Sequence, residues 1–436
     1  MSSRLKVLLL LLFLAFSALG THAEEPPAAD PERVRWVAEH ALAVRSLEPA
    51  EEDFSDLMPL VGVIGKARVV QLGEATHGDG ATFLAKGRLI RFLHQVMGFD
   101  VLAWESGFFD VRRVDEALRA GLPSAEAASL GLYPAWHNQE SLQTLDYVRA
   151  SQKTDRPILS VGFDCRVSAG VNKAEHFPKR IFDFFDRLDP ALLSKPERET
   201  FTAVSLAVNT LPMERFWKPE IRQHMALPRR LVETIDRRRG ELLVFYAPWE
   251  IDWVRQSLVS LLATERAIPL LGSPPNADGY RRDTVMAENL LWWLNGPLKE
   301  RKVIVWAHNY HVMNYNYLAR DEATARKGAP MGQHLKTALG ADLYTIGFTS
   351  YGGSYADPEA GGDQPVTPRP LETLLHAVGR PLLFLDLAHL PADHWLRTSW
   401  TANFYMYEPM ESTWTRVYDG LFFIDVQKPS TEVVAK

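Results

Sequence analysis

The chain has 436 residues, of which 46% are hydrophobic, and a formal net charge of -6 at pH 7. A chain of this length buries a large core, and we expect it to carry an inserted segment or a second lobe. A nucleic-acid partner is disfavoured, because phosphate recognition needs a basic surface and no long block of Lys and Arg follows the N-terminal segment. Cys165 is the single cysteine, which excludes an internal disulfide, and we interpret it as a buried small hydrophobe.

The N-terminus has the pattern of a targeting segment. Arg4 and Lys6 precede an apolar run over residues 7–19, and small residues before Glu24 offer a cleavage site. The run is shorter than the roughly 18 to 20 residues that a spanning helix needs. We therefore predict a signal peptide over 1–23 and a mobile arm over 24–31. The mature protein is expected to be periplasmic or secreted, without stable membrane insertion.

The rest of the chain alternates short apolar runs with amphipathic stretches. A helix is expected from about Glu32 to Ser46. Continuous apolar runs favour strands that helices cover on both faces, which is typical of a mainly parallel sheet. The expected strands are 69–72, 101–104, 158–163, 303–306, 344–348, 382–385 and 421–424.

The strand pattern mostly stops between Val167 and about Asn295, where several stretches look helical. We predict an α/β fold with a mainly parallel central sheet flanked by helices, formed by 32–167 and 296–436, and a helical insert over 168–295. The Gly/Pro-rich segment from Tyr351 to Pro368 is interpreted as a loop that leads to a smaller C-terminal α+β portion.

Several expected strands end in a side chain that can take part in catalysis. Glu74 and His77 follow the first strand, Glu105 the second, Asp164 the third and His308 the fourth. The carboxyl ends of parallel strands lie at one edge of a sheet, so these groups are expected to share one polar cleft. Any one of them alone is equally compatible with a helix cap or a satisfied core group.

Two cations are expected beside this cleft. Lys86 shares a helical face with apolar residues, so it points inward and pairs with a cleft glutamate or with a developing oxyanion. The alternative is that its stem reaches solvent. Arg282 shares a face with Met286 and Trp293 in the same way, although Arg281 is an equally plausible candidate.

Further side chains are candidates for substrate binding. Trp136 and His137 lie in an aromatic loop that is expected to wall a substrate pocket or, alternatively, to pack against the body of the protein. His311 follows His308 by three residues and can share its helical face or turn.

Several catalytic motifs are absent from the sequence. Without Gly-x-Ser-x-Gly, a serine nucleophile of the α/β-hydrolase kind has no support. The His-Glu-x-x-His motif, a P-loop and a dinucleotide fingerprint are absent as well, so no cofactor is expected.

These residues resemble the erythromycin esterase family. The family pattern Gly-Glu-Ala-Thr-His-Gly matches 73–78, the strand-end glutamate matches Glu105, Gly-Phe-Asp matches 162–164, and His-Asn-x-His matches 308–311. The Tyr-Asp-Gly turn at 418–420 also fits, and the resemblance spans about 30–425.

The resemblance implies hydrolysis of a small-molecule ester or lactone by a histidine that activates water, with neither a covalent acyl-enzyme nor a required metal. His77 would then be the general base, Glu74 and Glu105 would orient it and stabilise charge, and His308 would assist at the carbonyl or leaving group. Lys86 stands where the macrolide esterases carry an arginine, so the charge is kept and the bidentate fork is lost.

Two alternatives use the same residues. Glu74, His77, Glu105 and His308 could hold a divalent metal that generates hydroxide, in a metal-dependent hydrolase. The chain could instead be a non-catalytic protein that captures a polyketide or a saccharide near Trp136. The clustering of so many titratable groups favours an enzyme.

Overall fold

The computed structural model describes residues 29–166, 175–209, 223–267, 281–317, 328–357 and 360–433. The expected signal peptide and most of the expected arm lie outside these residues. Within the described ranges, no helix combines the length and the apolar character that crossing a membrane requires.

A nine-stranded sheet forms the centre of the molecule, in the order β1-β8-β11-β6-β2-β5-β3-β4, with β7 paired to β6. Neighbours from β11 to β4 are parallel, whereas β8 is antiparallel to β11. Each expected strand is present, and the expected α/β fold class is confirmed. The strands are β1 (Leu42–Ala43), β2 (Val69–Leu72), β3 (Val101–Gly107), β4 (Leu159–Asp164), β5 (Val303–Trp306), β6 (Leu343–Asp357), β7 (Gly362–Pro365), β8 (Leu382–Asp386) and β11 (Gly420–Gln427), with β9 (Trp400–Ala402) and β10 (Met410–Ser412) in a separate pair.

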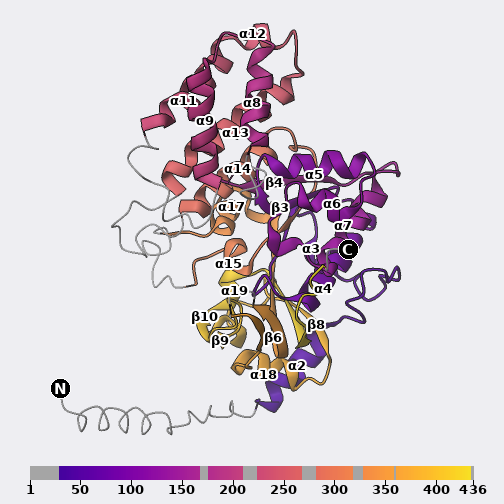
Figure 1. Cartoon of the computed structure of the whole chain (residues 1–436). Helices are drawn as coiled ribbons and strands as arrows, with labels where there is room; N and C mark the ends of the chain where they lie inside the picture. The colour runs from indigo at the N-terminus through magenta and orange to yellow at the C-terminus, as the bar shows by residue number, and fades with distance from the viewer. Residues whose placement is uncertain are drawn as a thin grey trace, which may run out of the picture.

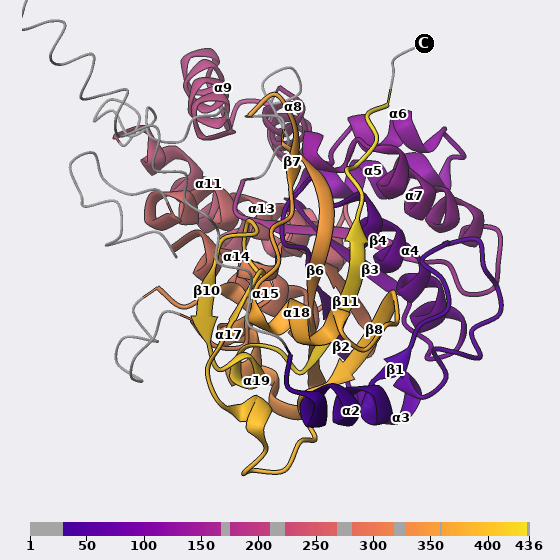
Figure 2. The same cartoon turned by 90° about the horizontal axis from the view of Figure 1, so that it is seen from below.

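Helices cover both faces of the sheet, because the apolar strands have no polar face to turn to water. Figure 2 shows α4 and α7 on one side of the strands and α14 and α17 on the other. The first core joins one strand face to α3 (Leu60–Ile64), α4 (Gly80–Gln95), α5 (Asp110–Arg119), α6 (Ser124–Ser129) and α7 (Gln139–Ser151). The second joins the other face to α2 (Pro31–His40), α14 (Arg281–Asn295), α15 (Asn309–Val312), α17 (Met331–Leu339), α18 (Pro370–His376) and α19 (Trp414–Val417).

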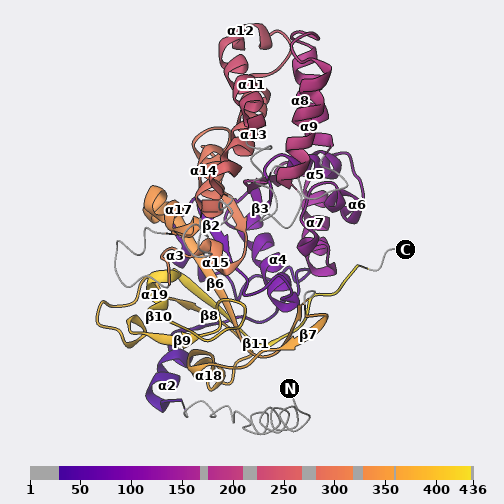
Figure 3. The same cartoon turned by 60° about the vertical axis from the view of Figure 1, so that its left-hand side comes forward.

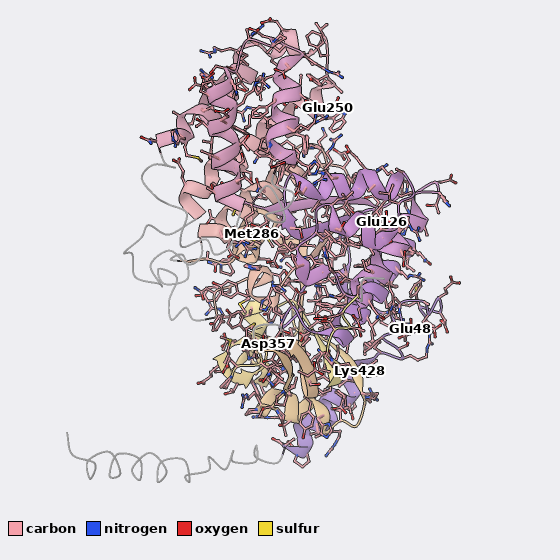
Figure 4. All side chains as sticks on the ribbon, viewed as in Figure 1. Glu48, Glu126, Glu250, Met286, Asp357 and Lys428 are labelled. Atoms are coloured by element: carbon pink, nitrogen blue, oxygen red, sulfur yellow. The ribbon has the colours of Figure 1, made fainter. Side chains whose placement is uncertain are left out.

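A third core belongs to helices that project from the sheet at the top of Figure 1. They lie within the expected insert 168–295, and Figure 3 shows them extending away from the strands. Figure 4 places Glu250 among these helices and Met286, on α14, where they meet the core. The projecting helices are α8 (His176–Asp186), α9 (Lys195–Asn209), α11 (Ala226–Arg237), α12 (Arg239–Leu242) and α13 (Pro248–Ala267).

Two local predictions are wrong. The first helix ends at His40 and not near Ser46, because Ala41 is extended and the next residues pair with β8. The expected loop from Tyr351 is largely a hairpin, in which β6 continues to Asp357 and pairs with β7. Glycines at this position disfavour a strand by propensity, but pairing with β11 along Gly352 and Gly353 overrides that preference.

Candidate active site

Four neighbouring strands bring their polar ends to one edge of the sheet. Leu72 of β2 and Trp104 of β3 both lie level with Trp306 of β5, and Gly162 of β4 lies level with Trp104. The next one or two residues of each strand therefore also meet. They are Glu74, His308, Glu105 and Asp164, and all of them are buried.

Glu74 and Lys86 form a fully buried ion pair, in which Lys86 Nζ donates to Glu74 Oε2. The ammonium also lies 4.1 Å from the centre of the Trp306 ring. Burial lowers the pKa of Lys86 to about 8, although the charge of Glu74 opposes this shift. Lys86 thus points inward as its helical spacing predicted, and the alternative of a solvated stem is not what the structure shows.

Glu74, His77, Lys86, Glu105, Asp164 and His308 are called the cluster below. His77 is its exposed member, with 44% of its side chain accessible. Its Nδ1 lies 3.4 Å from Glu74 Oε1, the carboxylate oxygen that Lys86 leaves without a hydrogen bond. The edge of the ring packs on Trp136 at a centroid distance of 4.8 Å. The contact with Glu74 is thus made by Nδ1, and almost half of the side chain is open to solvent or substrate.

Two hydrogen bonds fix His308, one to its backbone and one to its ring. Its own N–H donates to Glu105 Oε2 at 3.0 Å, and its Nδ1 accepts from the N–H of Tyr310 at 3.1 Å. Burial, together with the neighbouring His77 and His311, lowers the pKa of His308 well below its usual value. A neutral ring that accepts at Nδ1 carries its proton on Nε2. This buried nitrogen has no hydrogen bond of good geometry to a described residue, although a contact with the backbone of Ala75 opposes the lowering of the pKa. The His77 and His308 rings are 5.3 Å apart.

His311 belongs to a buried charge network behind His308. Its Nδ1 lies 2.7 Å from Asp283 Oδ1 and its Nε2 3.2 Å from Glu105 Oε1. Burial would lower the pKa of His311, but Asp283 and Glu105 raise it to about 10. His311 is therefore an imidazolium at neutral pH and donates to both carboxylates. His311 Nε2 also lies 3.1 Å from Arg282 Nη1. Both side chains are donors, and both donate to Glu105.

Arg282 links Glu105 to Asp164. Its Nη2 lies 3.1 Å from Glu105 Oε1 and 2.6 Å from Asp164 Oδ2, which also accepts from Tyr133 Oη at 2.7 Å. Burial would raise the pKa values of both Glu105 and Asp164. His311 and Arg282 nevertheless hold the pKa of Glu105 well below its usual value. Arg282 likewise lowers the pKa of Asp164. Both carboxylates thus stay ionised, and Arg282 is the second cation that was predicted. The side chain of Arg281 lies outside the described residues.

The loop that carries Glu74 and His77 is built on close backbone approaches. A Cβ at Gly73 would lie 2.0 Å from Asn309 Oδ1, and one at Gly78 would lie 1.8 Å from the Ala356 carbonyl oxygen. No other residue fits at either position without moving its neighbours. Gly73 and Gly78 therefore allow the close backbone packing of the loop, and Glu74 and His77 between them are the polar side chains of the site.

Sequence reasoning missed two acids that position the site. Asp79 is fully buried and accepts from the N–H groups of Ala75 and Thr76, both at 3.0 Å, which fixes the loop before His77. Asp283, next to Arg282, fixes His311. The sequence offered two signals for them: Asp79 directly follows the matched motif 73–78, and Asp283 is adjacent to the predicted cation Arg282.

The remaining predicted residues lie near the cluster in different ways. Trp136 is buried, packs on His77 and donates to the Glu105 carbonyl oxygen at 3.1 Å, so it walls the site and also packs into the core. His137 turns back on its own segment, with Nε2 3.2 Å from the Leu132 carbonyl oxygen. Cys165 is a free, buried thiol, as predicted.

The described residues contain no group of three or more His, Cys, Asp and Glu side chains that could hold a metal ion. The acids of the site instead pair with cations, Glu74 with Lys86, and Glu105 and Asp164 with Arg282. A cavity of 560 Å³ beside α5 and β4 is lined by Trp249 and Trp293, among others, and by no member of the cluster.

This fold and site define an α/β enzyme in which paired imidazoles and carboxylates lie at the carboxyl ends of parallel strands. A model of the erythromycin esterase family matches residues 94–426. The chain therefore belongs to the erythromycin esterase family of hydrolases.

Individual relatives agree with this membership. "Putative hydrolase YbfO" of Bacillus subtilis (strain 168) is 28% identical over 460 residues and covers 98% of both chains. Erythromycin esterase type II of Escherichia coli is 27% identical, over 74% of this chain and 78% of its own. A Bacillus cereus crystal structure superposes with a TM-score of 0.77 at 23% identity, covering 92% of this chain and 99% of that one. An erythromycin esterase mutant in its open conformation gives 0.65 at 17% identity, over 91% and 99%. At these identities, both structures support the fold alone.

Proposed function

We propose that this protein hydrolyses an ester or lactone of a small molecule with water that His77 activates. One observation carries the proposal. His77 is the accessible imidazole beside Glu74, and its Nδ1 faces the buried carboxylate of that residue. The neighbouring ring of His308 has a buried Nε2 without a hydrogen bond of good geometry to a described residue. A base, its orienting carboxylate and a donor for the carbonyl oxygen are thus adjacent.

The reaction follows from these positions. Nε2 of His77 takes a proton from water as the water oxygen bonds to the acyl carbon, and the electron pair of the C=O double bond moves to oxygen. The imidazolium of His77 is stabilised by Glu74 and then gives its proton to the departing alkoxide as the C–O bond breaks. The products are an acid and an alcohol, or a hydroxy acid from a lactone. General-base assistance of this kind contributes about 10² to 10⁴ in rate.

His308 supplies the electrophilic part of the mechanism. Because its pKa is depressed and its Nδ1 already accepts a hydrogen bond, the ring stays neutral and offers Nε2–H to the developing oxyanion. Removal of one such donor typically costs about 10² to 10³ in kcat. Glu105 holds the His308 backbone, and Arg282 and His311 hold Glu105, so these groups position the donor.

A panel of esters and lactones tests the proposal with purified protein. Hydrolysis in H₂¹⁸O should place one labelled oxygen in the acid product and none in the alcohol, which mass spectrometry detects. Single-turnover labelling should show no acyl-protein adduct. Absence of any turnover across the panel, or a kcat/KM in His77→Ala that equals that of wild type, would refute the proposal. Activity that is lost on chelation and restored by a divalent metal would favour the metal-dependent alternative.

Export remains part of the proposal. It is supported by the charged, apolar and small-residue order of residues 1–23, and fractionation of cells that express the full chain tests it. We propose no nucleic-acid partner, because the formal net charge of the chain is -6.

A further inference from the structure

A turn from far along the chain borders the site beside His308. The half-buried Tyr405 ring lies 5.4 Å from the ring of His308 and 5.4 Å from that of Tyr310. The next residue, Met406, donates its N–H to the Ala75 carbonyl oxygen at 2.9 Å. Ala75 lies two residues before His77, so the turn contacts both loops that carry the proposed catalytic histidines.

The backbone of this turn is strained. Met406 and Tyr407 have φ values of 51° and 53°, and among the described residues they are the non-glycine positions with positive φ. The left-handed region is unfavourable for large side chains, and such residues persist where the surrounding structure fixes them. Strain of this kind concentrates at functional sites.

The anchors that hold the turn belong to the loops of the site. Asn309, in the motif that follows β5, donates through Nδ2 to the Phe404 carbonyl oxygen at 2.8 Å. Tyr407 donates through Oη to Asp79 Oδ1 at 3.1 Å, and its ring stacks on Tyr355 at 4.9 Å. Hydrogen bonds and ring stacking therefore join the turn to the loops of the site. These anchors hold Met406 and Tyr407 in their strained backbone conformation.

The side chains that the turn presents are apolar and accessible. Met406 is 41% exposed, which is high for a large hydrophobic residue, and Tyr405 is half-buried. An aromatic ring offers a large rigid surface, and the flexible methionine adapts to the shape of what it contacts. The Tyr405 ring lies beside the ring of His308, where the carbonyl of an ester would be held, and Met406 is the next residue of the same turn.

We propose that Tyr405, with Met406, is the specificity-determining wall of the site and binds an extended apolar part of the ester or lactone. The inference rests on the proposed function for the bond that is cut. It adds the substrate class: an acyl group or ring with a hydrocarbon face next to the carbonyl. Small esters lack a group that reaches this wall.

Kinetics on acetyl and octanoyl esters of one alcohol test the wall. Tyr405→Ala should raise KM for the octanoyl ester about tenfold, because an aromatic contact is lost, and should leave KM for the acetyl ester unchanged. The kcat of Tyr405→Ala should stay within a factor of about 3, since the lost contact binds the ground state and the transition state equally. Tyr405→Phe should behave as wild type. Tyr246→Ala removes an equally half-buried ring from the projecting helices and should leave both KM values unchanged.

A binding measurement separates this inference from the proposed function. Octanoate titrated into wild type and Tyr405→Ala by calorimetry should bind the variant about tenfold more weakly. Tyr405-dependent octanoate binding without hydrolysis of any ester would refute the hydrolase and support the wall. Hydrolysis with equal KM values in both proteins, equal octanoate affinities, or no octanoate binding by either would overturn the wall. Thermal unfolding of each variant confirms that it is folded.

Discussion

Glu105 accepts a hydrogen bond of 3.0 Å from the backbone N–H of His308, across a separation of 203 residues along the chain. The contact joins the end of β3 to the end of β5. The N–H of Asn309 makes a similar link to the Glu74 carbonyl oxygen at 2.7 Å. The loop after β5 is thus fixed both to the end of β3 and to the loop that carries Glu74 and His77.

Substitution of the proposed general base should lower activity strongly and leave the fold intact. We expect His77→Ala to lower kcat/KM by about 10² to 10⁴, with little change in Tm because the side chain is accessible. His389→Ala is a matched control, since His389 is also an accessible histidine paired with an acid three residues away, Asp386. It should retain activity. Equal losses in the two variants would contradict the role of His77.

The Glu74–Lys86 pair should show strong coupling. Lys86→Met leaves a buried carboxylate unpaired and should reduce the free energy of unfolding by about 3 to 5 kcal/mol. Glu74→Gln combined with Lys86→Met should recover most of that stability, but not activity, since the orienting charge is gone. The exposed pair of Lys179 with Asp183 is the control, and Lys179→Met should change stability by less than about 0.5 kcal/mol. Additive effects of the buried substitutions in urea denaturation would contradict the pairing.

His308 should be neutral, with its proton on Nε2. We expect ¹⁵N chemical shifts of its ring to report the Nε2–H tautomer and to stay constant between about pH 5 and 8, where an unperturbed histidine titrates. His308→Ala should lower kcat about 10²- to 10³-fold, and His308→Gln, which keeps a side-chain donor, should lose less. A ring that titrates in this range, or one that carries its proton on Nδ1, would contradict the assignment.

Glu372 should make stability depend on pH. It is fully buried on α18, accepts from Thr349 Oγ1 at 2.6 Å and from the Asn403 N–H at 3.0 Å, and burial raises its pKa to about 7. A raised carboxyl pKa stabilises the protonated folded state, so the contribution is fully present below the unfolded pKa of about 4.3 and is lost as pH rises to about 7.

The corresponding variant is Glu372→Gln, which keeps the acceptor and cannot ionise. Over this window the free energy of unfolding of wild type should decline more steeply than that of the variant, by on the order of 1 kcal/mol per pH unit. Chemical denaturation at several pH values between 4 and 8 measures both slopes. Asp79, whose pKa is also raised to about 7 by burial, adds the same trend to both proteins. Parallel slopes would contradict the prediction.

Much of the fold was predictable because its signals are local. The apolar runs that end at Leu72, Trp104 and Trp306 are strands in the structure, and their common direction brings the following polar residues to one edge. Helical periodicity also placed Lys86 and Arg282 inward. The hairpin after Tyr351 was missed, because glycine-rich sequence disfavours a strand until a neighbouring strand pairs with it.

The sequence by itself determined that the groups at the strand ends, Glu74, Glu105, Asp164 and His308, lie at one edge of the sheet, since strand ends depend on the spacing of residues along the chain. Only the tertiary structure decided what each group does there. That Lys86 pairs with Glu74, that His311 is charged while His308 is neutral, and that Tyr405 lies against His308 all depend on burial and on neighbours from distant segments. Protonation states follow from burial and from partner charges, and the walls of a site follow from packing between distant segments; folding sets all of these.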